Sequence, residues 1–261
     1  HYFEKIVDTT DEWIRERTGI HQRHFAEEDQ LNSDLSAEAA KKAIADAGLT
    51  PEDIDMIIQA TCTPDRLIPS TAMAVQEKTG CVNAAGFDIN AACSGFVYGM
   101  SIANAMIVSG QAKNVLLIGT ELLSRVIDMT DRASCVLFGD GSGAVVLTGS
   151  TGDTGILGQY IQSDGRLRGL ITIPSGGTEL PPTPERLAEH LHYVHMRGNE
   201  VYKHAVTRLV DSSRKAIEAA GITADDIDMV IPHQANTRIL RSVAKRLRID
   251  YDEKFFINLP H

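Results

Sequence analysis

Cys93 has the surroundings of a reactive thiol. It follows a short apolar segment and precedes a nearly uncharged segment, Ser94 to Ser109, that stops at Gly110. This pattern predicts a strand that turns into a helix, with the cysteine at the helix start. Unpaired backbone N–H groups and the positive end of the helix dipole favour the thiolate there, which is the nucleophilic form of cysteine. The alternative interpretation is a buried core cysteine, because free cysteines are often buried.

His233 is the second residue that could take part in chemistry. An internal repeat places it, because residues 42–58 and 215–231 are identical at eleven of seventeen positions. Each copy predicts a helix, a glycine stop, an acidic turn and a buried strand. His233 follows the strand of the second copy, at the carboxyl end where open α/β sheets bind ligands. Cys93 and His233 could therefore form a nucleophile and a base.

Strands and helices alternate along the chain, and this alternation predicts a mostly parallel, layered α/β sheet. Together with the repeat, it predicts two related halves, residues 1–149 with the cysteine and residues 150–261 with the histidine. The expected strands span residues 54–61 and 114–120, a further strand begins at residue 87, and the expected helices span residues 36–48, 71–79 and 94–109.

The overall composition excludes several classes of protein. A net charge of −10 disfavours a nucleic-acid partner. No apolar run approaches the length that spans a bilayer, so no membrane segment is expected. The four scattered cysteines form no CxxC pair, which argues against a disulfide framework or a zinc site and is typical of a reducing cytosol.

Two segments resemble ligand sites only weakly. The glycine-rich segment Phe138 to Ala144 lacks the Lys-Ser/Thr of a P-loop and opens no helix, so a tight glycine turn with close packing is the better interpretation. His190, His192 and His195 are close in sequence. A strand would put the first two on one face and the third on the other, so we expect no metal site.

A short helix is expected from Asp8 to Gly19, and it carries Trp13 with Arg17 one turn later. Packing of Trp13 in a core is one interpretation. The alternative is an aromatic plate beside a cation, which suits stacking on a nucleotide base.

A second expected helix, within Gln234 to Arg248, is strongly basic. Residues 239, 243 and 247 are apolar and recur every four positions, so they should face inward. The helix then presents either an ordinary solvated face or a docking surface for an acidic protein. Its basic residues are Arg238, Arg241, Lys245, Arg246 and Arg248, with no acid among them.

Six motifs together resemble the beta-ketoacyl-[acyl-carrier-protein] synthase III family, in the family's order and from end to end of the chain. The family has the thiolase fold, two similar halves in a five-layered α/β/α/β/α architecture, in agreement with the repeat. The motifs are Asp11-Glu12-Trp13-Ile14 with Arg17-Thr18-Gly19-Ile20, Ala91-Ala92-Cys93-Ser94-Gly95-Phe96, Thr130-Asp131-Arg132, Phe138 to Ala144, Gly198-Asn199-Glu200-Val201-Tyr202-Lys203, and Pro232-His233-Gln234-Ala235-Asn236.

The resemblance implies an acyltransferase that starts type II fatty-acid biosynthesis. Cys93 would take the acyl group of a short acyl-CoA, and the enolate formed by decarboxylation of malonyl-acyl-carrier protein would then attack the acyl-enzyme. His233 would stabilise developing negative charge through a hydrogen bond to the thioester oxygen. Since the CoA thioester is a substrate, no cofactor is expected.

The resemblance also implies binding residues. Trp13 would stack on the CoA adenine, Arg17 and Arg132 would hold its phosphates or base, and Thr9 and Asn199 would line the same tunnel. The carrier-protein docking region would begin at Gln234, Ala235, Asn236, Thr237 and Arg238. A cytoplasmic homodimer is expected, in which the loop around Ile68 reaches the partner's acyl pocket.

One departure from the family concerns its third catalytic residue, an asparagine expected just beyond His261. We therefore expect the printed chain to be an internal part of a longer enzyme. Three alternatives stay open: a non-catalytic acyl-CoA or carrier-protein binding module of the same fold, a degradative thiolase, and a nucleotide-binding α/β module.

Overall fold

The computed structural model describes residues 2–152 and 154–261, which divide into two units. Of the described residues, the first unit, here named the sheet unit, comprises 24–125, 139–152 and 154–156. The second, the helical unit, comprises residues 2–23, 126–138 and 157–261. Each unit has its own hydrophobic core. Both units combine chain from either side of residue 149, and the predicted division into two related halves stays a prediction.

The sheet unit is built on four strands in the order β2-β1-β3-β4. The first three run parallel, as predicted, and β4 is antiparallel to β3. Parallel strands end at one edge of a sheet, so the residues that follow β1, β2 and β3 gather there. The strands are β1 (Met56–Ala60), β2 (Ala85–Ile89), β3 (Asn114–Leu122) and β4 (Asp140–Thr148).

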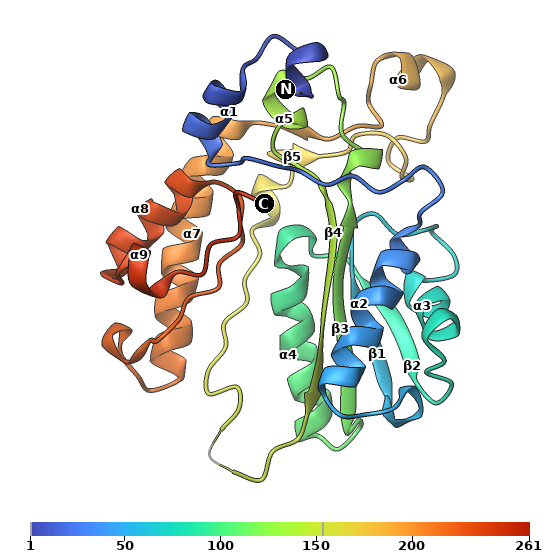
Figure 1. Cartoon of the computed structure of the whole chain (residues 1–261), viewed down its shortest axis with the longest axis vertical. Coiled ribbons are helices and arrows are strands. Elements are labelled where there is room, and N and C mark those ends of the chain that lie inside the picture. Colours follow the sequence, from blue (N-terminus) through green and yellow to red (C-terminus); the bar gives the residue numbers. More distant parts are fainter. Residues whose placement is uncertain (1, 153) are drawn as a thin grey trace. The chain divides into compact units, whose positions relative to one another are not determined.

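Helices cover both faces of this sheet (Figure 1), α2 (Asn32–Asp46) and α3 (Thr71–Thr79) on one and α4 (Gly95–Val108) on the other. Side chains of successive strand residues alternate between the faces. Leu116 and Ile118 accordingly belong to the core beneath α2 and α3, whereas Leu117 belongs to the core beneath α4. All three are fully buried.

Two glycines bring α4 close to the sheet. A Cβ atom on Gly99 would lie 2.2 Å from Cδ1 of Leu117, and one on Gly95 would lie 3.0 Å from Cβ of Ala60. Only a residue without a side chain fits at such distances. The first turn of α4 is therefore seated directly against β1 and β3.

The helical unit is organised around α7 and α8, which pack through buried aliphatic side chains. Val206 and Val210 of α7 meet Ile239, Val243 and Leu247 of α8, so the predicted inward face of the basic helix is confirmed. Two short strands, β5 (Ile171–Thr172) and β6 (His195–Met196), pair antiparallel, and the chain between them contains α6. The helices are α1 (Asp11–Thr18), α5 (Arg132–Cys135), α6 (Pro184–Ala188), α7 (Gly198–Ala219), α8 (Thr237–Leu247) and α9 (Tyr251–Lys254).

The two copies of the repeat share their local structure up to the strand. Each helix ends at a left-handed glycine, Gly48 or Gly221, and each turn is closed by the same Thr–Asp hydrogen bonds. In the second copy the predicted buried strand is wrong. Val230 makes only an isolated bridge with Phe255, and Ile231 is 76% exposed. An apolar segment becomes a buried strand only where strands flank it, and the described residues provide just this one bridge beside Val230.

Two further predictions are corrected. Residues 140–144 of the glycine-rich segment are not a tight turn but the start of β4, which pairs with β3 at nine positions. A Cβ on Gly141 or Gly143 would meet nothing within 4 Å, so no close packing requires these glycines. His190 and His192 are not on a strand either. They lie in the turn after α6, and only His195 belongs to β6.

The helices α2 and α3 begin at or within four residues of the positions predicted from the sequence. α3 spans the predicted residues, whereas α2 begins at Asn32, four residues before the predicted start, because the Asp34 carboxylate accepts a hydrogen bond from the Leu31 N–H. Over the described part of the chain, none of the helices has the length and apolarity that crossing a bilayer requires.

Candidate active site

Cys93 lies in a single 3-10 turn, Ala92–Ser94, that leads directly into α4. Ala92 has the positive φ of 45° that L residues rarely adopt, and this conformation turns the chain from β2 into the helix. Cys93 is exposed, whereas Cys81 and Cys135 are buried. The core-cysteine interpretation is therefore wrong for Cys93, which lies at the surface of the sheet unit although protein atoms surround its sulfur.

A carboxylate and a second thiol share the edge of the sheet with Cys93. Glu121 lies near the end of β3, and Cys62 follows β1. The Glu121 carboxylate accepts hydrogen bonds from the Cys62 backbone N–H at 2.8 Å, the Cys62 thiol at 3.3 Å and the Thr63 hydroxyl at 2.6 Å. The sequence analysis missed this cluster, although the position of both residues at the carboxyl ends of parallel strands was a usable signal.

These neighbours oppose the expected activation of the thiol. Crowding by protein atoms raises the pKa of Cys93, the negative charge of Glu121 raises it further, and the backbone N–H of Cys93 lowers it only in part. Burial and Glu121 also raise the pKa of Cys62 to about 12. The resting chain therefore holds both as thiols near neutral pH, and Cys93 must lose its proton when it attacks.

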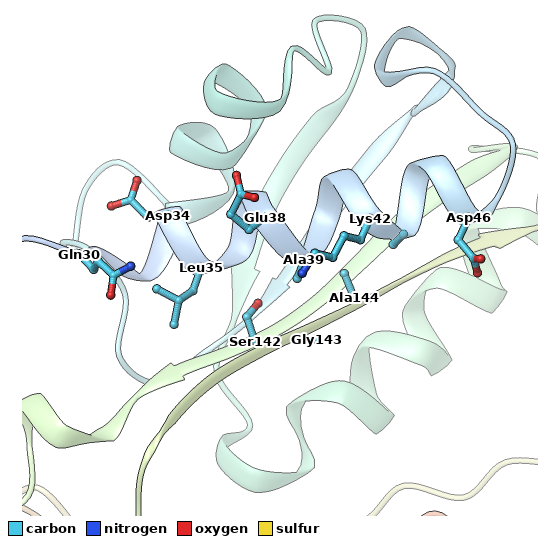
Figure 2. Close-up of a pocket in the computed structure, with 11 residues that line it drawn as sticks. Gln30, Asp34, Leu35, Glu38, Ala39, Lys42, Asp46, Ser142, Gly143 and Ala144 are labelled. Carbon is cyan, nitrogen blue, oxygen red and sulfur yellow. The ribbon is translucent and has the colours of Figure 1, made fainter. Parts of the chain in front are cut away.

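A groove between α2 and β4 lies elsewhere in the sheet unit (Figure 2). The side chains of Asp34, Glu38 and Asp46 on α2 and of Ser142 on β4 line it, together with Lys42. Neither a thiol nor an imidazole is among its lining residues. The groove therefore lacks the thiol and the imidazole predicted to act as nucleophile and base, and the candidate active site is the sheet edge that carries Cys93.

In the helical unit, Trp13 forms the aromatic plate that the sequence left as an alternative to core packing. Its ring is half-buried, with the guanidinium carbon of Arg132 at 4.9 Å and that of Arg17 at 6.0 Å from its centroid. Arg132 is held in place because it also donates a hydrogen bond to the Asp8 carbonyl at 2.9 Å. The hydroxyl of Thr9 is buried without a hydrogen-bond partner.

His233 lies in the segment before α8, with an exposed side chain. Protein atoms around the ring lower its pKa, so it is neutral at physiological pH and carries one N–H. The amide of Gln234 supports this segment, because it accepts hydrogen bonds from the Asn258 and Leu259 N–H groups and donates to the Phe256 carbonyl.

The start of α8 is joined to the end of α1. Asn236 caps α8 through the Arg238 N–H and donates a hydrogen bond to the Arg17 carbonyl at 3.2 Å. A Cβ on Gly19 would lie 2.0 Å from the Thr237 hydroxyl. The predicted CoA residues of α1 and the predicted docking residues of α8 are therefore neighbours. Ala235 is half-buried, and Asn199 is exposed in the first turn of α7.

The outer face of α8 is positively charged. All five of its predicted basic residues are exposed, and the groove between α7 and α8 extends this charge, because it is lined by Lys203, Lys245 and Arg246. A hydrogen bond of 3.1 Å joins the Tyr202 hydroxyl on α7 to the Ser242 hydroxyl on α8, and both residues line the groove. The sequence analysis did not single out Lys203, although it falls within one of the sequence motifs.

In the histidine-rich segment, the side chains of His190 and His195 make hydrogen bonds with neighbouring groups. His190 Nδ1 pairs with the Asp128 carboxylate, and His195 Nε2 lies 3.2 Å from the His190 carbonyl. Over residues 2–152 and 154–261, no group of three or more histidine, cysteine, aspartate or glutamate side chains could hold a metal ion.

Two family models match the chain. Residues 87–165 match the model of 3-oxoacyl-[acyl-carrier-protein (ACP)] synthase III, and residues 217–261 match the model of the C-terminal part of that enzyme. The first match contains Cys93 and the second contains His233.

Characterised relatives and solved structures agree with these matches. The beta-ketoacyl-[acyl-carrier-protein] synthases III of Caldanaerobacter subterraneus and Roseiflexus castenholzii are each 49% identical to this chain over 98% of its length and 77% of theirs. The crystal structure of 3-oxoacyl-[acyl-carrier-protein] synthase III from Aquifex aeolicus is similar with a TM-score of 0.89 and 42% identity. The match covers 98% of this chain and 78% of the Aquifex aeolicus chain.

Proposed function

This chain belongs to the beta-ketoacyl-[acyl-carrier-protein] synthase III family, and from that premise we propose that Cys93 and His233 carry its chemistry. It has the thiolase-like α/β fold of these condensing enzymes. As a member it is an acyltransferase that condenses acetyl-CoA with malonyl-acyl-carrier protein to initiate fatty-acid synthesis. The single observation that carries the residue assignment is the exposed thiol of Cys93 at the first turn of α4, on the sheet edge where ligands bind.

In the first half-reaction, the sulfur of Cys93 attacks the thioester carbonyl of acetyl-CoA. The thiol proton is lost as the new C–S bond forms, and the carbonyl electrons move to the oxygen. The backbone N–H of Cys93, at the start of α4, is suited to hold this oxyanion. When the tetrahedral intermediate collapses, the bond to the CoA sulfur breaks, CoA leaves as a thiol after taking up a proton, and an acetyl-Cys93 thioester remains.

In the second half-reaction, malonyl-carrier protein loses CO2, and the electrons of the broken C–C bond form an enolate. A neutral imidazole can donate its N–H to the thioester oxygen of that enolate, which is the role we assign to His233. The enolate carbon then attacks the acetyl-Cys93 carbonyl. The C–S bond breaks, Cys93 recovers a proton, and 3-ketoacyl-carrier protein leaves.

Acyl-CoA binding is assigned to the region around Trp13. An indole face flanked by the guanidinium groups of Arg132 and Arg17 suits an adenine base next to phosphates. The buried, unpartnered hydroxyl of Thr9 offers a hydrogen bond to the same ligand, and Asn199 is assigned to the same site.

Docking of the acidic carrier protein is assigned to the start and outer face of α8. Among the five predicted docking residues, Arg238 is exposed, whereas the side chains of Gln234 and Asn236 are already used to hold the segment. The groove that contains Lys203 extends the positive surface. Complementary charge of this kind raises the association rate and fixes the orientation of the partner.

A homodimer and a cytoplasmic location complete the proposal. Leu67 and Ile68 are each 86% exposed, and two neighbouring aliphatic side chains at such exposure suit a surface that a second subunit covers. The four cysteines are all free, as in a reducing compartment. Sedimentation velocity over a range of concentrations tests the dimer, and a single monomeric species would contradict it.

Intact mass spectrometry after incubation with acetyl-CoA tests the central assignment. Wild type should gain one acetyl group, Cys93→Ala should gain none, and the matched control Cys62→Ala should still gain one. His233→Ala should be acetylated but should not release 3-ketoacyl product when malonyl-carrier protein is added.

The outcomes separate the competing interpretations. Acetylation of wild type without any condensation would favour the non-catalytic binding module. No adduct on a folded protein, with acetyl-CoA or with longer or branched acyl-CoAs, would contradict the assignment of Cys93 as nucleophile. The Cys62 control excludes acylation of the neighbouring thiol.

A further inference from the structure

Glu121 is the charged group in the Cys93 cluster, and the condensation mechanism gives it no role. It is only partly exposed, near the carboxyl end of β3. A carboxylate there is unexpected, because a negative charge disfavours ionisation of a nearby thiol. The question is therefore what the carboxylate does for the nucleophile.

The position of Glu121 follows from the strand register. Ala60 of β1 pairs with Gly119 of β3 and with Ile89 of β2. The first turn of α4 is seated on this row, because a Cβ on Gly95 would touch Ala60 and one on Gly119 would touch Phe96. Glu121 lies two residues beyond Gly119. Cys62 likewise lies two residues beyond Ala60, and Cys93 lies two residues before Gly95. The Glu121 carboxylate and the thiols of Cys62 and Cys93 therefore gather beside one row of paired residues in the sheet.

The carboxylate is fixed from several sides. Its partners are the Cys62 N–H, the Cys62 thiol and the Thr63 hydroxyl, with the Thr61 hydroxyl at a longer 3.4 Å. Thr63 also accepts a hydrogen bond from the Leu122 N–H at 2.9 Å, which closes a ring between the β1 turn and β3.

A buried polar network holds these partners in turn. The Asn32 amide, 2% exposed, donates to the Thr61 hydroxyl, the Thr63 carbonyl and the Thr120 carbonyl. Such a network gives the turn after β1 one defined position. Glu121 is therefore held rigidly enough to act on its surroundings through its charge.

We propose that Glu121 is a positioning residue for the Cys93 nucleophile: its carboxylate fixes the Cys62–Thr63 turn beside the first turn of α4 and keeps a negative charge next to the Cys93 thiol. The inference rests on the proposed function, in which Cys93 is the acylated residue. Its chemical consequence is a nucleophile that stays protonated in the resting enzyme and loses its proton only when it attacks the acyl-CoA.

Other charged groups of the sheet unit stand near this edge, and each already has partners. Asp88 accepts hydrogen bonds from the Thr71 and Ala72 N–H groups, Asp140 from Ser124, and Asp65 from the Ser33 N–H. Among the charged groups, Glu121 is the one that raises the pKa of Cys93, after burial itself. The charge on Glu121 is therefore the variable to change.

The test measures the rate of Cys93 alkylation by iodoacetamide from about pH 6 to about pH 10, with peptide mapping to separate Cys93 from Cys62. Glu121→Gln keeps the size of the side chain and one of its two acceptor oxygens, and it removes the charge. We expect the midpoint of the pH profile to fall by at least about half a unit, which is about a threefold faster reaction at neutral pH. Glu77→Gln, an exposed change on α3, is the matched control and should leave the midpoint unchanged.

An unchanged midpoint in Glu121→Gln would overturn the proposal, and so would slower alkylation at every pH without a change of midpoint, since that indicates a purely structural residue. If Glu121→Gln does not fold, Thr63→Val decides. It keeps the charge but removes the 2.6 Å hydrogen bond, and it should slow acetylation of Cys93 by about threefold or more. An unchanged acetylation rate in a folded Thr63→Val protein would contradict the positioning role.

Failure of this inference can be told from failure of the proposed function. If wild type gains no acetyl group at Cys93, the proposed function has failed, and the alkylation profile still decides whether Glu121 acts on the thiol. If wild type is acetylated and Glu121→Gln behaves as wild type at every pH, only the role of Glu121 is lost.

Discussion

Replacement of Gly99 by alanine should lift α4 from the sheet and displace Cys93, the proposed nucleophile, in the turn that leads into the helix. The new Cβ would lie 2.2 Å from Cδ1 of Leu117, and carbon atoms in contact need about 3.5–4.0 Å. One of the two must therefore move by more than an ångström. Leu117 is fully buried within the core beneath α4 and has little room to yield.

The expected destabilisation follows from two opposing contributions. Overpacking of a dense core costs about 1–3 kcal/mol. The higher helix propensity of alanine offsets up to about 1 kcal/mol of this destabilisation. The 2.2 Å approach places the overpacking cost in the upper part of its range, about 2–3 kcal/mol, so Gly99→Ala should lower the free energy of unfolding by about 1–2 kcal/mol. A displacement of Cys93 by about 1 Å would lower the rate of acetylation by up to about 100-fold.

A double-mutant cycle with Leu117→Ala measures this contact. Leu117→Ala alone should cost about 2–5 kcal/mol, because it leaves a cavity. In the Gly99→Ala background the same change should cost at least about 0.5 kcal/mol less, since the new methyl group occupies part of the space. Denaturant unfolding gives the free energies, and intact mass at timed intervals gives the acetylation rate. Additive free energies, or a Gly99→Ala protein as stable and as fast as wild type, would refute the reasoning.

Three further predictions test other parts of the molecule. Trp13→Ala should raise the KM for acetyl-CoA about tenfold or more through loss of base stacking, with the iodoacetamide reaction of Cys93 unchanged; an unchanged KM would contradict the assignment of the CoA site. Arg246→Glu should raise the KM for malonyl-carrier protein several-fold at low salt, and less at high salt, without slowing acetylation. Folding raises the pKa of the Cys62 thiol from 9.0 to about 12. The stability that the protonated thiol contributes is therefore complete below pH 9 and is lost as the pH rises towards 12. In Cys62→Ala the free energy of unfolding, measured at several pH values, should fall less between pH 9 and pH 12 than in wild type.

Local structure was readable from the sequence because its causes are local. The left-handed glycines Gly19 and Gly110 end their helices where the sequence predicts. The spacing of apolar residues in α8 predicts its buried face, since a side chain returns to the same face after one turn. The sequence pattern places Cys93 between a strand and a helix, because small residues separate an apolar segment from a long, nearly uncharged one.

The tertiary structure decided what depends on chain segments far apart in sequence. Arg132 meets Trp13 only because the chain between them folds back, and Glu121 meets Cys62 only because β1 and β3 are neighbours. The strand β4 exists because β3 pairs with it, and Ile231 is exposed where its equivalent Ile58 is buried because only Ile58 lies within the sheet. By itself, the sequence determined the family and most of the helices and strands, and it predicts Cys93 as the nucleophile; these inferences depend on short-range pattern. Which groups surround the nucleophile, and the sign of their effect on its pKa, was decided by the long-range packing of strands and helices.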